Sequence, residues 1–155
     1  MSKPVIVLIP GAWHTTESFL PLITQLSLSS YPTVAIAPPS TGAHPGHPSF
    51  DQDVAYIRST LDTLLSADKD VVVVMHSGGS VIGSEALRDR SRKYRREKGL
   101  EGGVTRLVYI SILLPKAGTS MAETFQKAVM AEDLDEGFVI DADQSFHVIA
   151  AVGLS

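Results

Sequence analysis

The chain has 155 residues, of which 44% are hydrophobic and 19% are charged, and it contains no cysteine. This length and composition predict about one globular domain, and the lack of cysteine excludes disulfides and thiolate metal sites. The net charge of −4 argues against nucleic acid as a partner. No apolar run approaches the ~20 residues of a membrane helix and no signal-peptide pattern opens the chain, so we expect a cytoplasmic protein without membrane contact.

The first half of the chain alternates strand-like and helix-like segments. Residues 5–9 and 33–37 are short apolar runs, each closed by proline, and are typical of buried strands. Residues 17–28 and 51–65 carry apolar side chains at helical spacing. Strands that alternate with helices predict an α/β fold with a parallel, doubly wound sheet and right-handed crossovers.

A run of valines, Val71–Val74, leads directly into Met75-His76-Ser77-Gly78-Gly79. Consecutive valines are typical of a parallel strand that is buried on both faces. The glycine pair ends the strand, and we expect one helix over 81–98. A serine at such a strand-to-helix turn presents its hydroxyl beside the backbone N–H of the next residue. The pattern predicts a nucleophile elbow at Ser77; the alternative is a plain turn in which Ser77 caps the helix.

The segment Pro10-Gly11-Ala12-Trp13-His14 follows the first predicted strand. In open α/β sheets, active sites form at the carboxyl ends of the strands, so this loop and the predicted elbow are expected to meet. The backbone N–H of Ala12 or Trp13, together with that of Gly78, would then form a two-donor oxyanion hole. The alternative is a strand-ending turn with Trp13 covering the core.

These two motifs, together with Arg106-Leu107-Val108-Tyr109-Ile110-Ser111, resemble the α/β-hydrolase fold superfamily. Within it the chain is most similar to the esterase-like branch of plant methyl esterases, hydroxynitrile lyases and fungal relatives. The superfamily elbow is Gly-x-Ser-x-Gly; Met75 replaces the first glycine here and Gly79 keeps the last. The first oxyanion loop usually begins His-Gly, whereas this one begins Pro10-Gly11.

The resemblance implies a carboxylic ester hydrolase in which Ser77 is the nucleophile and no cofactor or metal takes part. A small hydrophobic ester or lactone is the expected substrate. Two alternatives stay open. One is a lyase or isomerase on the same fold, and the other is a catalytically silent binding or assembly module.

The family's acid and base normally follow two later strands. Two more strand–helix units need on the order of 60 residues, more than follow Ile110. We therefore expect residues 1–115 to form a partial hydrolase core and 116–155 a partial cap, with a short helix over 118–131 and a strand pair over 137–151. Met121, Phe125 and Met130 could line an acyl pocket or simply pack. Because the usual acid and base are missing, self-sufficient activity is not expected.

Five histidines are the chain's possible bases. His147, with Asp143 before it, has the family's chain order, so Ser77, Asp143 and His147 are the substitute triad to consider. His76 is expected to pack under the elbow. His14 could reach substrate or brace its loop. His44 and His47 have a spacing that suits a metal, but no carboxylate or cysteine lies nearby, so no metal site is predicted.

Seven of the 13 lysines and arginines lie between Arg88 and Lys98. This run could dock an acidic partner, but a solvated helix end is the interpretation we favour. A partial sheet would also leave an edge uncovered. A homodimer or a partner chain could cover that edge, in addition to the small-molecule substrate.

Overall fold

The computed structural model describes residues 2–47, 49–110, 118–120 and 123, and the backbone of 138–140 and 146–148. The chain divides into two compact units, Met1–Ile112 and Leu113–Ser155. The predicted boundary after residue 115 lies outside the described residues. The chemistry-bearing motifs that the sequence analysis emphasised lie in the first unit.

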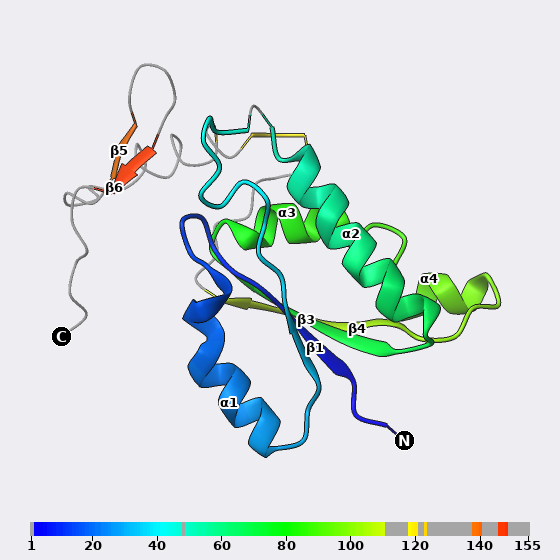
Figure 1. The fold of residues 1–155 in the computed structure, drawn as a ribbon. Helices are drawn as coiled ribbons and strands as arrows, with labels where there is room; N and C mark the ends of the chain where they lie inside the picture. Colours follow the sequence, from blue (N-terminus) through cyan, green and yellow to red (C-terminus); the bar gives the residue numbers. More distant parts are fainter. Residues whose placement is uncertain are drawn as a thin grey trace. The chain divides into compact units, whose positions relative to one another are not determined.

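The first unit is built on a four-stranded sheet in the order β2-β1-β3-β4 (Figure 1). Its strands are β1 (Val5–Ile9), β2 (Thr33–Ala35), β3 (Asp70–His76) and β4 (Gly103–Ile110). Every neighbouring pair is parallel. The predicted α/β fold with a parallel sheet is therefore confirmed, although β2 ends two residues earlier than its apolar run.

Five helical segments accompany the sheet: η1 (Thr16–Phe19), α1 (Leu20–Leu28), α2 (Asp51–Ser66), α3 (Gly79–Ala86) and α4 (Arg92–Glu97). Helix α1 covers one face, and α2 and α3 cover the other (Figure 1). The larger core cluster joins Val73 and Met75 of β3 to Ile57 and Leu61 of α2. A smaller cluster on the opposite face includes Leu8, Val74 and Phe19. Alternate residues of β1 and β3 thus face opposite helix layers, as the double-sided burial of an apolar strand requires.

The single helix predicted over 81–98 is wrong. Helix α3 ends at Ala86, Asp89 has a left-handed φ of 63°, and Ser91 makes an isolated parallel bridge to Val104. Ser91 then starts α4, where its side chain accepts a hydrogen bond from the backbone N–H of Tyr94. The apolar stripe ends at Leu87, so nothing holds a longer helix against the sheet, and Ser91 supplies a new N-cap.

Strand β4 lies at one edge of the described sheet and is more exposed than the strands inside it. Val104 is buried, but Leu107, Val108, Tyr109 and Ile110 are each 37–44% exposed. Because side chains alternate along a strand, these residues expose apolar surface on both faces of the sheet.

In the second unit, β5 (Phe138–Ile140) and β6 (Phe146–Val148) form an antiparallel pair. This agrees with the strand pair predicted over 137–151. Most of the helix predicted over 118–131 lies outside the described residues, as do Met121, Phe125 and Met130.

Candidate active site

Ser77 lies at the tight turn between β3 and α3, and its backbone has a φ of +47°. Its N–H donates to the Ile110 carbonyl at 3.0 Å, and its own carbonyl accepts from the Ser80 N–H at 3.0 Å. A left-handed backbone is unfavourable for a residue with a Cβ, so the surrounding hydrogen bonds hold a strained conformation. A strained serine on a strand–turn–helix connection is the geometry of a nucleophile elbow.

The glycines after Ser77 let α3 pack closely on β1 and its loop. A Cβ on Gly79 would lie 2.3 Å from the Pro10 carbonyl oxygen, and one on Gly83 would lie 2.6 Å from the sulfur of Met75. Gly83 is not among the predicted site residues. The four-residue spacing from Gly79, which puts both glycines on one helix face, is the signal that could have identified it.

The loop after β1 meets the elbow at its backbone. A Cβ on Gly11 would lie 3.0 Å from the Cβ of Ser77. A Cβ on Gly78 would lie 3.3 Å from the backbone nitrogen of Ala12. The structure therefore brings Ala12 and Gly78, two of the predicted oxyanion donors, next to each other and next to the serine.

Trp13, the third predicted donor, does not cover the core. It is 64% exposed and has a φ of 62° in the turn that joins Gly11 to His14. The alternative in which Trp13 covers the core is therefore wrong for this structure. The indole instead offers an apolar surface on the loop that contacts the elbow.

Two histidines meet beside the serine. His14 and His76 have ring centroids 5.3 Å apart in an edge-to-face arrangement. Nδ1 of His14 lies 2.8 Å from the Ala12 carbonyl oxygen, which is the loop-bracing contact that the sequence analysis left open. Burial, and secondarily the proximity of His14, lowers the pKa of His76 below its ordinary value. His76 is therefore a neutral imidazole at neutral pH.

The predicted base and acid are not brought to Ser77 by what the structure describes. Asp143 lies outside the described residues. The backbone of His147 belongs to β6 in the second unit, and its side chain lies outside the described part. Among the described residues, no three His, Asp or Glu side chains gather in an arrangement that could hold a metal ion.

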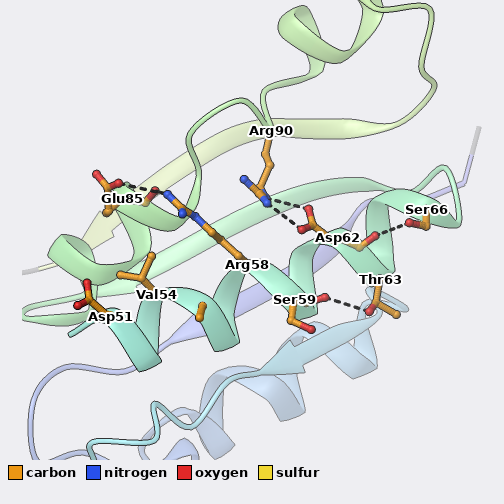
Figure 2. A pocket seen from close by; sticks show the side chains of 10 residues that line it. Asp51, Val54, Arg58, Ser59, Asp62, Thr63, Ser66, Glu85 and Arg90 are labelled. Atoms are coloured by element: carbon orange, nitrogen blue, oxygen red, sulfur yellow. Dashed lines mark hydrogen bonds and ion pairs between the residues drawn. The ribbon is translucent and has the colours of Figure 1, made fainter. Parts of the chain in front are cut away.

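A large open groove of about 750 Å³ lies between α2 and α3. Figure 2 shows its two arginines turned toward carboxylates: Arg58 donates to Glu85 and Arg90 to Asp62. None of the predicted site residues lines it. Arg58 and Glu85 join α2 to α3, and Arg90, in the connection after α3, binds Asp62 of α2, so these ion pairs indicate a structural role.

The basic run is also largely engaged within the chain. Arg88 pairs with Glu85, Arg90 with Asp62 and Arg92 with Asp70. Arg95 donates to the carbonyls of Leu65 and Glu101. These contacts argue against a docking surface. They also differ from the favoured interpretation of a solvated helix end, because four of the seven cations bind partners within the chain.

Residues 6–149 match the Alpha/beta hydrolase family, and the chain belongs to that family. It is 34% identical over 154 residues to the alpha/beta hydrolase nvfD of Aspergillus novofumigatus, covering 96% of this chain and 61% of nvfD. It is 31% identical to the probable hydrolase R7 of a Phoma species, covering 92% of this chain and 57% of R7. The chain thus spans about three-fifths of the length of these curated relatives.

Solved structures show the same fold. Tomato methylketone synthase I, complexed with 2-tridecanone, superposes with a TM-score of 0.64 at 17% identity, covering 94% of this chain and 54% of that one. Polyneuridine aldehyde esterase superposes with a TM-score of 0.65 at 18% identity, covering 89% of this chain and 53% of that one.

Of the described helices, none is long and apolar enough to cross a membrane.

Proposed function

We propose that this chain carries the nucleophile and the oxyanion-binding loop of a serine esterase, in which Ser77 attacks the carbonyl carbon of a small apolar ester or lactone. The observation that carries the proposal is the backbone contact between the loop after β1 and the elbow. Ser77 is held at a φ of +47°, and the Ala12 nitrogen lies beside Gly78. Family membership supports hydrolase chemistry in general.

In the proposed reaction, Ser77 Oγ forms a bond to the carbonyl carbon and loses its proton to a base. The electron pair of the carbonyl moves onto its oxygen. The N–H groups of Ala12 and Gly78 then donate to this oxyanion, a type of contact whose removal costs about 3 kcal/mol per donor. When the carbonyl re-forms, the bond between its carbon and the alcohol oxygen breaks, and the leaving alkoxide takes the proton that the base had accepted. Water, deprotonated by the same base, then attacks the acyl-serine, the bond to Ser77 Oγ breaks, and Oγ takes back the proton as the acid is released. His147, with Asp143, is the base that this chain could supply.

The expected substrate is apolar at the acyl or alcohol group. The support is the exposed indole of Trp13 on the loop that carries Ala12. An aromatic surface beside two backbone donors is the combination that small apolar ligands with one polar group use.

The test is labelling of the purified chain with a fluorophosphonate probe, followed by mapping of the modified peptide. Because the family's usual acid and base are missing, labelling requires that His147 supply the base; Ser77 should then be labelled, and Ser77→Ala should abolish the labelling. Ser29→Ala, which changes an exposed serine at the end of α1, is the matched control and should label normally. Loss of labelling in His147→Ala would support His147 as the base.

Absence of labelling in a chain that circular dichroism shows to be folded would overturn the proposal for this chain by itself. The remaining interpretation would then be a catalytically silent binding module. Turnover of a substrate that survives Ser77→Ala would instead indicate lyase or isomerase chemistry.

A further inference from the structure

The loop after β1 is a β-turn of an uncommon kind. The His14 N–H donates to the Gly11 carbonyl at 3.1 Å, so Ala12 and Trp13 are its two central residues. Trp13 has a φ of 62°, whereas Ala12 is not among the residues of positive φ. A positive φ at the third position alone defines a type II turn, in which glycine or asparagine is the usual residue. Tryptophan has a Cβ, so a positive φ at this position is strained and must be stabilised by a contact with the rest of the loop.

The side chain of His14 makes that contact. Its Nδ1 lies 2.8 Å from the carbonyl oxygen of Ala12, which belongs to the central peptide of the turn. A carbonyl oxygen only accepts hydrogen bonds, so Nδ1 carries the proton and is the donor. The edge-to-face contact with His76, at 5.3 Å between centroids, holds the imidazole from another side.

The central peptide has one alternative orientation. Type I and type II turns differ by rotation of this peptide by roughly 150–170°, which would carry the Ala12 carbonyl away from His14. The rotation would also bring Trp13 to a negative φ and so relieve its strain. The hydrogen bond from His14 therefore opposes this relaxation.

We propose that His14 is a positioning residue that latches the oxyanion loop in its type II form. This inference rests on the proposed function, because the latched peptide carries the N–H of Trp13, the alternative donor predicted for this loop, and adjoins the residue that carries the Ala12 N–H. Preorganised donors stabilise an oxyanion because they need not reorient during the reaction. His14 acts here through the loop and takes no proton from Ser77.

The first test compares two substitutions at one position. His14→Leu removes the donor and should lower the rate of Ser77 labelling, or kcat on an ester, roughly ten- to a hundredfold with KM little changed. His14→Asn places an amide nitrogen where Nδ1 stood and should restore most of the rate. If His14 were instead a base, Asn would fail to rescue and the pH–rate profile would lose a limb, which would overturn the proposal.

A second test uses the residue that is strained. Trp13→Gly adopts a positive φ without cost, so the latch becomes less necessary. The fold-loss of rate caused by His14→Leu should therefore be at least several times smaller in the Trp13→Gly background than in the wild type. Equal effects in both backgrounds would overturn the latch.

A third test does not depend on activity. In ¹⁵N-histidine NMR spectra, His14 is expected to be the Nδ1–H tautomer. Trp13 is the chain's one tryptophan, and its fluorescence should change in His14→Leu but much less in His14→Asn. If the wild type fails to react with the probe, the proposed function fails while these spectra still decide the latch. An Nε2–H tautomer, or a fluorescence spectrum unchanged in His14→Leu, would overturn it.

Discussion

The residues around Ser77 are small because another segment's backbone occupies the space a side chain would need. Gly79 is the extreme case, with the carbonyl oxygens of Pro10 and Ile9 at 2.3 and 2.8 Å from the position of a Cβ. Neither atom belongs to a flexible side chain, so it cannot move without shifting the strand end. The elbow and the loop after β1 are therefore one packed unit.

Gly79→Ala is expected to lower the free energy of unfolding by about 3 kcal/mol, since overpacking against backbone is not relieved by rotamer change. Urea unfolding followed by circular dichroism would measure it. Gly46→Ala is the matched control, because a Cβ there meets no atom within 4 Å. An equal stability of the two variants would contradict the close packing.

His76 should make stability depend on pH. Burial, and then repulsion from His14, lowers its pKa from the ordinary value of 6.5. Between the two pKa values the unfolded chain binds more protons than the folded one, so stability is complete above pH 6.5 and falls as pH drops below it. The decline flattens once the pH is below the folded-state pKa.

Urea midpoints measured from about pH 7.5 to 5 would test this, with His76→Gln expected to flatten the curve. A wild-type midpoint that rises on acidification through this range would contradict the assignment.

At the scale of elements, α4 connects the C-terminal end of α2 to the segment before β4 through hydrogen bonds from Arg95. Arg95 donates to Leu65, one of the last carbonyls of α2, at 2.9 Å and to Glu101 at 2.8 Å. The Leu65 carbonyl also accepts from the Asp68 N–H at 3.1 Å, so Arg95 adds a charged donor at this helix end and connects it to the segment that carries Glu101. The basic run is thus a set of structural contacts that the charge pattern alone does not reveal.

Arg95→Met should therefore cost about 2 kcal/mol of stability, because the charged donor to the carbonyls of Leu65 and Glu101 is lost. Arg96→Met is the matched control on the same helix. Within the described part of the chain, no hydrogen bond or ion pair joins the Arg96 side chain to another residue, so a change within about 0.5 kcal/mol is expected. Equal losses in thermal or urea unfolding would argue against the contact as the cause.

At the scale of the whole molecule, the exposed strand β4 is the surface at which we expect two chains to associate. An apolar edge strand offers both unpaired backbone groups and apolar surface to another sheet. Leu107 and Val108 point to opposite faces and are 44% and 41% exposed. We expect the isolated chain to associate with a second copy through β4.

Light scattering after size exclusion should show a mass that rises with concentration, and Val108→Lys should shift it toward one chain. Leu28→Lys places the same change on another exposed apolar residue, 76% exposed at the end of α1, and should not alter the mass. A single-chain mass at every concentration would contradict association through this edge.

The elements and the elbow could be read from the sequence because their signals are local. Val71–Val74 carries its own burial pattern, and the glycines after Ser77 mark the turn. The helix break after Ala86 also has local signals, the end of the apolar stripe and the N-cap Ser91, but the bridge that fixes it joins Ser91 to Val104, which are distant in sequence. The engaged state of the basic run was missed for the same reason.

By itself, the sequence determined the parallel α/β fold, the strand-turn-helix position of Ser77 and the resemblance to α/β hydrolases. Only the tertiary structure decided that the Ala12 nitrogen lies beside Gly78, that His14 braces its loop, and that Trp13 is exposed. The physical reason is the distance along the chain over which each signal acts. Periodicity and turn residues act over a few neighbours, whereas the site joins the ends of two strands that pair only after the chain folds.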